Sequence, residues 1–137
     1  MFFLTAQGAN LMEANLEDAN LARANLSYTD FSHARLVGAD LSRTELIQAE
    51  LIQAELIQAE LSYADLTDAN LQRADLGAAY LLAADLSGAD LSGAYLNHVT
   101  YNTTPYRKNG RITRFPKGFN PEDHNMYLWN PKPNASP

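Results

Sequence analysis

Apolar side chains recur at every fifth position over most of the chain, and this period does not suit a helix. Leucine, replaced once by Phe31, occupies every fifth position from Leu11 to Leu96, which makes 18 consecutive centres. Alanine precedes almost every centre by two residues, with Thr29 and Thr44 as the substitutions. Five residues advance an α-helix by about 500°, so these leucines would not share one helical face. The repeat therefore indicates a different regular structure.

Short extended sides joined by corners account for the five-residue unit. An extended segment points residues two apart to the same side, so the Ala and Leu of one unit can face the same interior. Four such sides with four corners make a square coil of about twenty residues, and stacked coils would pair at the strand spacing of about 4.8 Å. The pattern predicts a rod with Leu and Ala inside and the other three positions of each unit outside.

These tandem A-(N/D/E)-L-x-x units resemble the pentapeptide-repeat family, whose pattern is A-(D/N)-L-x-x. The resemblance implies an all-β fold, a right-handed quadrilateral β-solenoid (parallel β-helix) of about 4.5–5 coils with a small C-terminal cap. Ala6 and Tyr101 continue the register at the two ends. The segment TRFPKGFNP at residues 113–121 resembles the one that closes such proteins in photosynthetic bacteria. The family resemblance therefore suggests a bacterial, cyanobacterial type.

Breaks in the pattern divide the chain into four predicted parts. Residues 1–8 form an N-terminal cap, residues 9–100 the solenoid, residues 101–129 a C-terminal cap, and residues 130–137 a disordered tail. Phe2, Phe3 and Leu4 are expected to cover the first coil or to form a dimer contact, because an uncovered coil end exposes unpaired backbone groups.

The C-terminal cap carries turn and helix signals. Asn109-Gly110 predicts a small hairpin from Tyr106 to Phe115. Asn120 as N-cap followed by Pro121 predicts a short helical turn to about Tyr127. Apolar side chains in this region are expected to cover the last coil: Phe115, Phe119, Tyr127, Leu128 and Trp129.

Charge divides unevenly between the rod and the tail. The net charge of −6 combines −10 over residues 9–98 with +4 over residues 99–137. An acidic rod argues against direct nucleic-acid binding by the rod and permits basic partners. The chain has no cysteine, and no apolar run is long enough to span a bilayer. We therefore expect a cytoplasmic protein without a membrane role.

The sequence offers no reactive constellation. The histidines His33, His98 and His124 lack metal-ligand spacing, and the acidic residues would line flat faces and not a cleft. We expect no catalytic residues, no metal, no cofactor and no enzymatic activity.

Three groups of residues make up the predicted interaction surface. The first is the apolar belt made by three identical LIQAE units, Ile47, Ile52 and Ile57. The second is a column of acids twenty residues apart, Glu45, Asp65 and Asp85. The third is the aromatic tail, Phe115, Phe119, Tyr127 and Trp129. Arg23, Arg43 and Tyr63 form a further column that could place a cation over a ring.

Three functions remain open. The first is a non-enzymatic scaffold or binding protein with an unknown protein partner, able to form a homodimer through its N- or C-terminal end. The second is a DNA mimic that modulates a topoisomerase such as gyrase, as quinolone-resistance members of the family do. The rod would carry one charge per about 2.2 Å, against about 1.7 Å for duplex DNA. The third is a structural or engineered solenoid, suggested by the three identical units.

Overall fold

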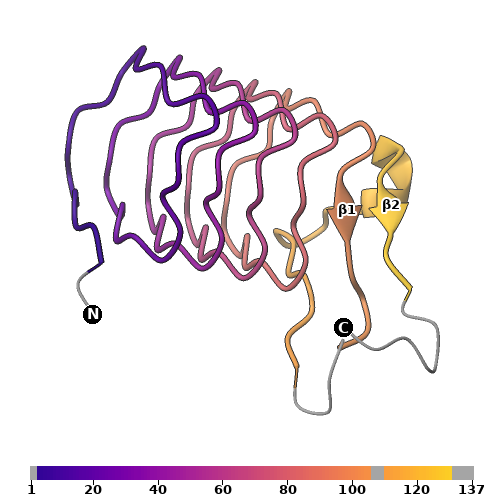
Figure 1. Ribbon diagram of the computed structural model, residues 1–137. Helices are drawn as coiled ribbons and strands as arrows, with labels where there is room; N and C mark the ends of the chain where they lie inside the picture. The colour runs from indigo at the N-terminus through magenta and orange to yellow at the C-terminus, as the bar shows by residue number, and fades with distance from the viewer. Residues whose placement is uncertain (1–2, 106–109, 131–137) are drawn as a thin grey trace.

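The structure, a computed structural model, describes residues 3–105 and 110–130. Successive coils are joined by parallel β-bridges between residues 20 apart, which run at five-residue intervals from Thr5–Asn25 to Tyr80–Thr100. Four bridges per 20 residues give each coil four sides, and the coils stack into a rod (Figure 1). The parallel β-solenoid predicted from the five-residue period is therefore the observed fold.

Backbone hydrogen bonds explain why the period is so strict. Asn25 donates its N–H to Leu4 O at 3.0 Å, and Ala6 donates to Asn25 O at 3.0 Å. The same exchange recurs at each later side, so every coil uses the backbone of both neighbours. An insertion must therefore leave the ladder as a loop, because the paired sides before and after it keep their places in the stack.

Each corner is a tight turn whose third residue is left-handed. The Leu carbonyl accepts the N–H of the residue three positions on, as in Ala54 N to Leu51 O at 3.1 Å. The second residue after each centre has φ between +54° and +73°, at every unit from Gly8 to His98. Only four of these positions are glycine, so most corners hold an L-residue in a conformation that it adopts rarely. Packing and the ladder must offset that cost.

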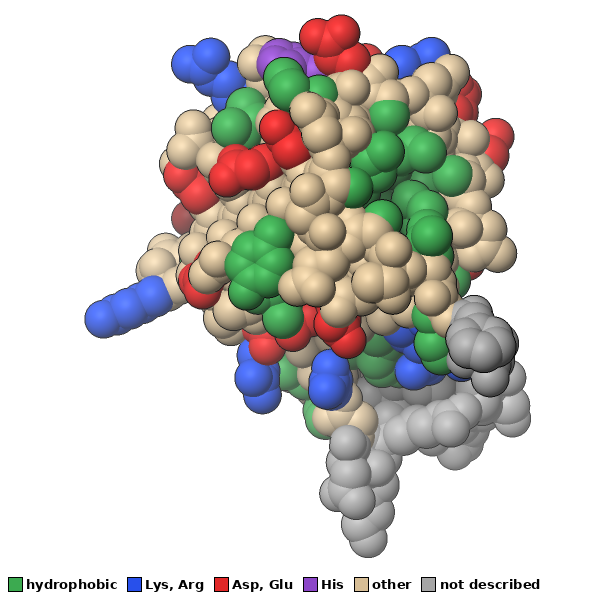
Figure 2. Space-filling model, turned by 90° about the vertical axis from the view of Figure 1, so that its left-hand side faces the viewer, with side chains coloured by type: hydrophobic (Ala, Val, Ile, Leu, Met, Phe, Trp, Pro, Cys, Tyr) green, Lys and Arg blue, Asp and Glu red, His purple; other side chains and the backbone are tan. Residues whose placement is uncertain are grey.

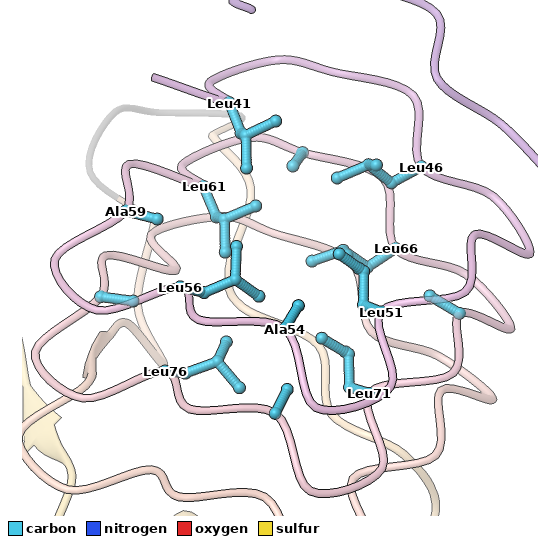
Figure 3. Close-up of a cluster of buried hydrophobic side chains, with 14 of the residues drawn as sticks. Leu41, Leu46, Leu51, Ala54, Leu56, Ala59, Leu61, Leu66, Leu71 and Leu76 are labelled. Carbon is cyan, nitrogen blue, oxygen red and sulfur yellow. The ribbon is translucent and has the colours of Figure 1, made fainter. Parts of the chain in front are cut away.

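The interior contains the leucines and alanines of the repeat. From Leu26 to Leu86 the central side chains, with Phe31, are fully buried. Leucines 20 apart, such as Leu41 and Leu61, lie one over the other and point inward (Figure 3). Thr44 is also buried, and its hydroxyl donates to Leu41 O at 2.6 Å, so its polar group is satisfied.

The N-terminal end differs from the prediction. The solenoid register begins at Thr5, four residues before the boundary predicted at residue 9. The expectation that Phe3 and Leu4 cover the first coil is wrong, since their side chains are 46% and 54% exposed. The Leu4 carbonyl is paired with Asn25, which holds this segment alongside the second coil and away from the open end. The predicted cap residue Phe2 lies outside the described residues.

The C-terminal segment continues the stack after an insertion. Arg114 pairs with Asp85, 29 residues earlier, so it occupies the side that residue 105 would otherwise fill. Strand β1 (Thr100–Tyr101) then pairs in parallel with strand β2 (Tyr127–Leu128). Much of the predicted hairpin from Tyr106 to Phe115 lies outside the described residues. Its described end joins the solenoid through Arg114.

A short turn separates these two sides of the last coil. The 3₁₀ turn η1 (Pro121–His124) begins after Asn120, whose side chain accepts the Glu122 N–H at 3.2 Å. It ends three residues before the predicted end near Tyr127, because Asn125 is left-handed (φ 51°) and leads the chain into β2.

Fewer of the predicted residues cover the last coil than the sequence suggested. Phe119 and Met126 pack against the core, and Phe115 stacks on Phe119 with 4.9 Å between ring centroids. Tyr127 and Leu128 do not cover the core, since they are 54% and 52% exposed. Because the backbone of these two residues pairs with β1 at the edge of the stack, their side chains remain outside the core. Met126 was missed because a lone methionine carries no repeat signal. Pro131 and the rest of the predicted disordered tail lie outside the described residues.

Candidate functional site

The outward residue before each centre is ordered by a local hydrogen bond. Its side-chain oxygen accepts the N–H of the residue two positions on, as in Met12 N to Asn10 Oδ1 at 3.1 Å. Twelve units share this bond, at 10, 15, 20, 25, 30, 40, 60, 65, 70, 75, 85 and 90. The Asn and Asp side chains of these sides therefore have one preferred orientation each.

Glutamates in the same position behave less uniformly. Glu60 makes the turn bond, since its side-chain oxygen accepts the Ser62 N–H at 2.9 Å. Glu50 instead accepts from Asn70 at 3.0 Å, and Glu55 accepts from Arg35 at 3.3 Å. Glu50 and Glu55 therefore link neighbouring coils, as Asp90 does through Gln72, whereas Glu60 bonds within its own unit.

The predicted acidic column lies on one side of the rod. Glu45 pairs with Asp65 across adjacent coils, and Asp65 pairs with Asp85. Asp65 accepts from the backbone N–H of Thr67 at 3.0 Å and from its hydroxyl at 2.6 Å, and Asp85 is held in the same way by Ser87. The next side along the chain carries Asp30, Glu50 and Asp90, so two adjacent sides hold most of the ordered acids.

Two of these acids are held in the ionised form. Partial burial raises the pKa of Asp85, but hydrogen bonds from Ser87 and the charge of Arg114 outweigh it, so the pKa lies below its ordinary value. Hydrogen bonds from Ser92, joined by one from Gln72, lower the pKa of Asp90. Both carboxylates therefore present negative charge at neutral pH.

The structure places the three isoleucines of the predicted belt on successive sides of the rod. Ile47, Ile52 and Ile57 are half-buried and lie on three successive sides. Ile47 and Ile52 have polar residues at the equivalent positions of the coils above and below: Ser27, Thr67, Ser32 and Gln72. Ile57 differs, because Val37 occupies the equivalent position of the preceding coil.

Arg43 and Tyr63 occupy equivalent corners of adjacent coils, and the C-terminal segment lies beside them at Gly110 and Arg111. The Arg43 guanidinium lies 4.6 Å from the Tyr63 ring centroid, which confirms the predicted cation–ring contact. A hollow of about 320 Å³ beside it is lined by Tyr63, Leu82, Arg111, Trp129 and neighbouring residues. A second of about 440 Å³ is lined by Arg43, Tyr63, Gly110 and Arg111. Sequence reasoning missed these hollows, since the insertion before Arg114 creates them.

The remaining predicted aromatic residues lie apart from this corner. Phe115 and Phe119 belong to the covering of the last coil, where His124 stacks on Phe119 at 4.6 Å. Tyr127 stacks on His98 at 4.9 Å. Trp129 lines the hollow beside Tyr63, and Phe119 lines a different hollow with His124 and Asp90.

The described residues contain no group of three or more His, Cys, Asp or Glu that could hold a metal ion. Within the same part of the chain, no helix is both long and apolar enough to cross a membrane. These two findings leave the outer surface as the feature to be explained.

Repeating coils with a filled core and patterned sides define the class of β-solenoid repeat proteins. The Pentapeptide repeats family model (8 copies) matches residues 7–43, 34–73 and 64–100, which together span well over half of the chain. The chain belongs to the pentapeptide-repeat family. The match is consistent with the right-handed winding that the resemblance implies.

Solved structures of the same family are similar to the chain. The pentapeptide repeat protein alr5209 from Nostoc PCC 7120 is 30% identical over 93% of this chain and 86% of that one, with a TM-score of 0.48. AT2G44920, from the Arabidopsis thaliana thylakoid lumen, is 23% identical over 77% and 70%, with a TM-score of 0.49. HetL from Nostoc sp. strain PCC 7120, described as involved in heterocyst differentiation regulation, is 36% identical over 77% and 50%, with a TM-score of 0.44. Among curated proteins, none matches the chain.

Proposed function

We propose that the protein is a non-enzymatic binding module whose two adjacent acidic sides engage a basic protein partner. The observation that carries the proposal is the fixed orientation of the carboxylates. Asp30, Asp65, Asp85 and Asp90 each accept a hydrogen bond from the backbone of the same unit. A preordered charge loses little side-chain entropy on binding, so it contributes more to affinity than a mobile one.

The distribution of basic residues supports the choice of these two sides. Arg35, which pairs with Glu17 at 3.1 Å and Glu55 at 3.3 Å, neutralises a third side. On the acidic sides, the ion pair seen among the described residues is Asp85 with Arg114 at 3.4 Å, close to the C-terminal end. The middle of these sides therefore keeps its negative charge available for a partner.

Charge-neutralising variants test the proposal. The variant Glu45→Gln/Asp65→Asn/Asp85→Asn should lose proteins that the immobilised wild-type chain retains from native lysate. The matched control Asp40→Asn/Glu55→Gln/Asp75→Asn removes the same charge from the other two sides and should retain them. Asn serves the turn bond at Asn10, so the Asp→Asn changes preserve the fold. Equal retention by both variants, or no retained protein, contradicts the proposal.

A second use of the same charge is modulation of a topoisomerase by imitating DNA. The observation in its favour is the regular spacing of acids along two adjacent sides. A gyrase supercoiling assay separates it from the first proposal. Inhibition by the wild-type chain and not by the first triple variant would support it, and no effect at micromolar protein would refute it.

Self-association through the N-terminal end is supported by a separate observation. Leu11, Leu16 and Leu21 are only partly buried, and hydrophobic side chains reach the surface at this end (Figure 2). We propose that a second copy covers this end. Sedimentation that shows a monomer at every concentration would refute the dimer and leave the acidic-side proposal standing.

A further inference from the structure

The corner where the C-terminal segment meets the rod joins two kinds of side chain that recognise flat anions. Tyr63 and Trp129 line one hollow, and Arg43 and Arg111 line the adjoining one with Tyr63. Tyr63 and Arg111 line both, so the two hollows adjoin. Their volumes, about 320 and 440 Å³, are typical of small-molecule sites.

The guanidinium groups at this corner form no ion pair within the part of the chain that the structure describes, although Arg111 lines a further hollow with Asp65 and Asp85. Across residues 3–105 and 110–130, the arginines within 4.0 Å of a carboxylate are Arg35 and Arg114. Arg43 instead lies over the Tyr63 ring, 4.6 Å from its centroid. Arg43 and Arg111 therefore line one hollow that has no carboxylate among its described lining residues, while Asp65 and Asp85 line a separate hollow that Arg111 also borders.

The wall opposite the cations is apolar and firmly held. Leu82 and Ala83 line the first hollow, and Ala83 is buried. The buried Asn102 accepts the Ala83 N–H at 2.7 Å and donates to Thr104 O and Arg111 O at 2.9 and 3.0 Å. This network ties the Arg111 backbone to the solenoid, so the site is formed before any ligand binds.

We propose that this corner binds a mononucleotide. The base would lie in the hollow lined by Tyr63 and Trp129, and the phosphate would be bound by Arg43 and Arg111. Stacking on aromatic rings accepts any base, and guanidinium groups bind phosphate through paired hydrogen bonds. A single nucleotide suits two small adjoining hollows, whereas the acidic sides on the rest of the rod would repel a polymer.

Trp129 is the only tryptophan in the chain, so its fluorescence reports on the site directly. Titration of the full chain with AMP should quench the emission saturably. Adenosine, which lacks the anion, and inorganic phosphate, which lacks the ring, should each bind at least about tenfold more weakly. Quenching by AMP that rises linearly without saturation, or no quenching at millimolar AMP, would overturn the proposal.

Matched variants show whether the named residues carry the binding. Arg43→Gln and Arg111→Gln should each raise the Kd for AMP about tenfold, the expected loss of one charge-assisted contact. Arg73→Gln removes an arginine from a different corner and should leave the Kd unchanged. Tyr63→Leu should weaken binding, whereas Tyr28→Leu, an exposed tyrosine at another corner, should not.

Calorimetric titration and thermal unfolding accompany each variant, so that loss of the fold is distinguished from loss of the site. A Kd that is unchanged in a folded Arg43→Gln/Arg111→Gln protein would refute the assignment. The acidic-side proposal is tested by a different readout, the retention of proteins from lysate, so the two outcomes are distinguishable even though Asp65 and Asp85 line a hollow with Arg111.

Discussion

The two ends of the rod use the same repeat but finish it differently. At the N-terminal end, the leucines of the first coil remain partly buried, and Phe3 and Leu4 lie on the flank. At the C-terminal end, the chain leaves the repeat, inserts a loop and returns to form two more sides at Arg114 and β2. Leu96 and Val99 there are almost fully buried, under Phe119 and Met126.

The comparison shows that finishing a solenoid needs larger side chains than extending it. Inside the rod, Leu and Ala suffice because each coil is covered on both faces by its neighbours. The final coil has one neighbour, so Phe119 and Met126 fill the space that another Leu–Ala layer would occupy. The N-terminal end has no such layer among the described residues, and the N–H groups of Asn10, Asn15 and Asn20 lack a backbone acceptor there.

Truncating a core leucine should have the largest effect. Leu51→Ala leaves a cavity in a fully buried layer and should lower the free energy of unfolding by about 2–5 kcal/mol in urea denaturation. The matched change Leu11→Ala, in the half-buried first coil, should cost less than half as much, because water already reaches that side chain. Equal losses would show that the N-terminal end is covered in solution.

Removing the buried side-chain amide of Asn102 should give the second-largest loss of stability. Asn102→Ala leaves the Ala83 N–H and the Arg111 carbonyl without this partner and should cost about 3 kcal/mol. The loss should be local, because each coil contacts only its neighbours. Hydrogen exchange should quicken at residues 113–129 and stay slow at residues 30–60, and uniform loss of protection would contradict the local account.

Replacing a corner glycine by alanine should cost more stability inside the rod than at the open N-terminal end. Gly88 has φ +73°, and a Cβ there would meet the Asp68 carboxylate, so Gly88→Ala should cost about 1–3 kcal/mol. Gly8 has φ +69° with open space around it, so Gly8→Ala should cost only about 1 kcal/mol. Thermal unfolding of the two variants measures the difference.

Loss of the Asp85–Arg114 ion pair at the C-terminal end should change the stability least. Because the folded pKa of Asp85 is lowered, its stabilisation is present above the unfolded pKa of about 3.9 and is lost as the pH falls through the folded value. Asp85→Asn should lower stability by about 0.5 kcal/mol at pH 7. The difference from wild type should shrink as the pH falls below about 3.9 and disappear once Asp85 is protonated in the folded state as well, and a difference that persists there would contradict this assignment.

Much of the fold could be predicted from the repeat, because a strict five-residue period admits one extended side and one corner per unit. The burial of Leu41 or Ala54 follows from position in the unit alone. The acids before each centre were also predictable as turn-bonding residues, since Asn and Asp bond locally. The roles of Glu50 and Glu55 were not, because their contacts are with residues 20 positions away.

The candidate sites depended on the tertiary structure to different degrees. The column of Glu45, Asp65 and Asp85 could be found by counting in twenties, and so could the contact of Arg43 with Tyr63. The hollows between Tyr63, Arg111 and Trp129 could not, because 66 residues of the sequence separate Tyr63 from Trp129 and the insertion before Arg114 has no repeat.

The sequence by itself determined the coil, its register and the residues inside it, because those properties repeat and each unit restates them. Only the tertiary structure decided how the rod ends. The first-coil segment remains beside the second coil because its backbone is paired there, and the C-terminal segment returns to the stack because Phe119 and Met126 gain apolar burial on the last coil. Both outcomes depend on contacts made once, between segments that no local pattern relates.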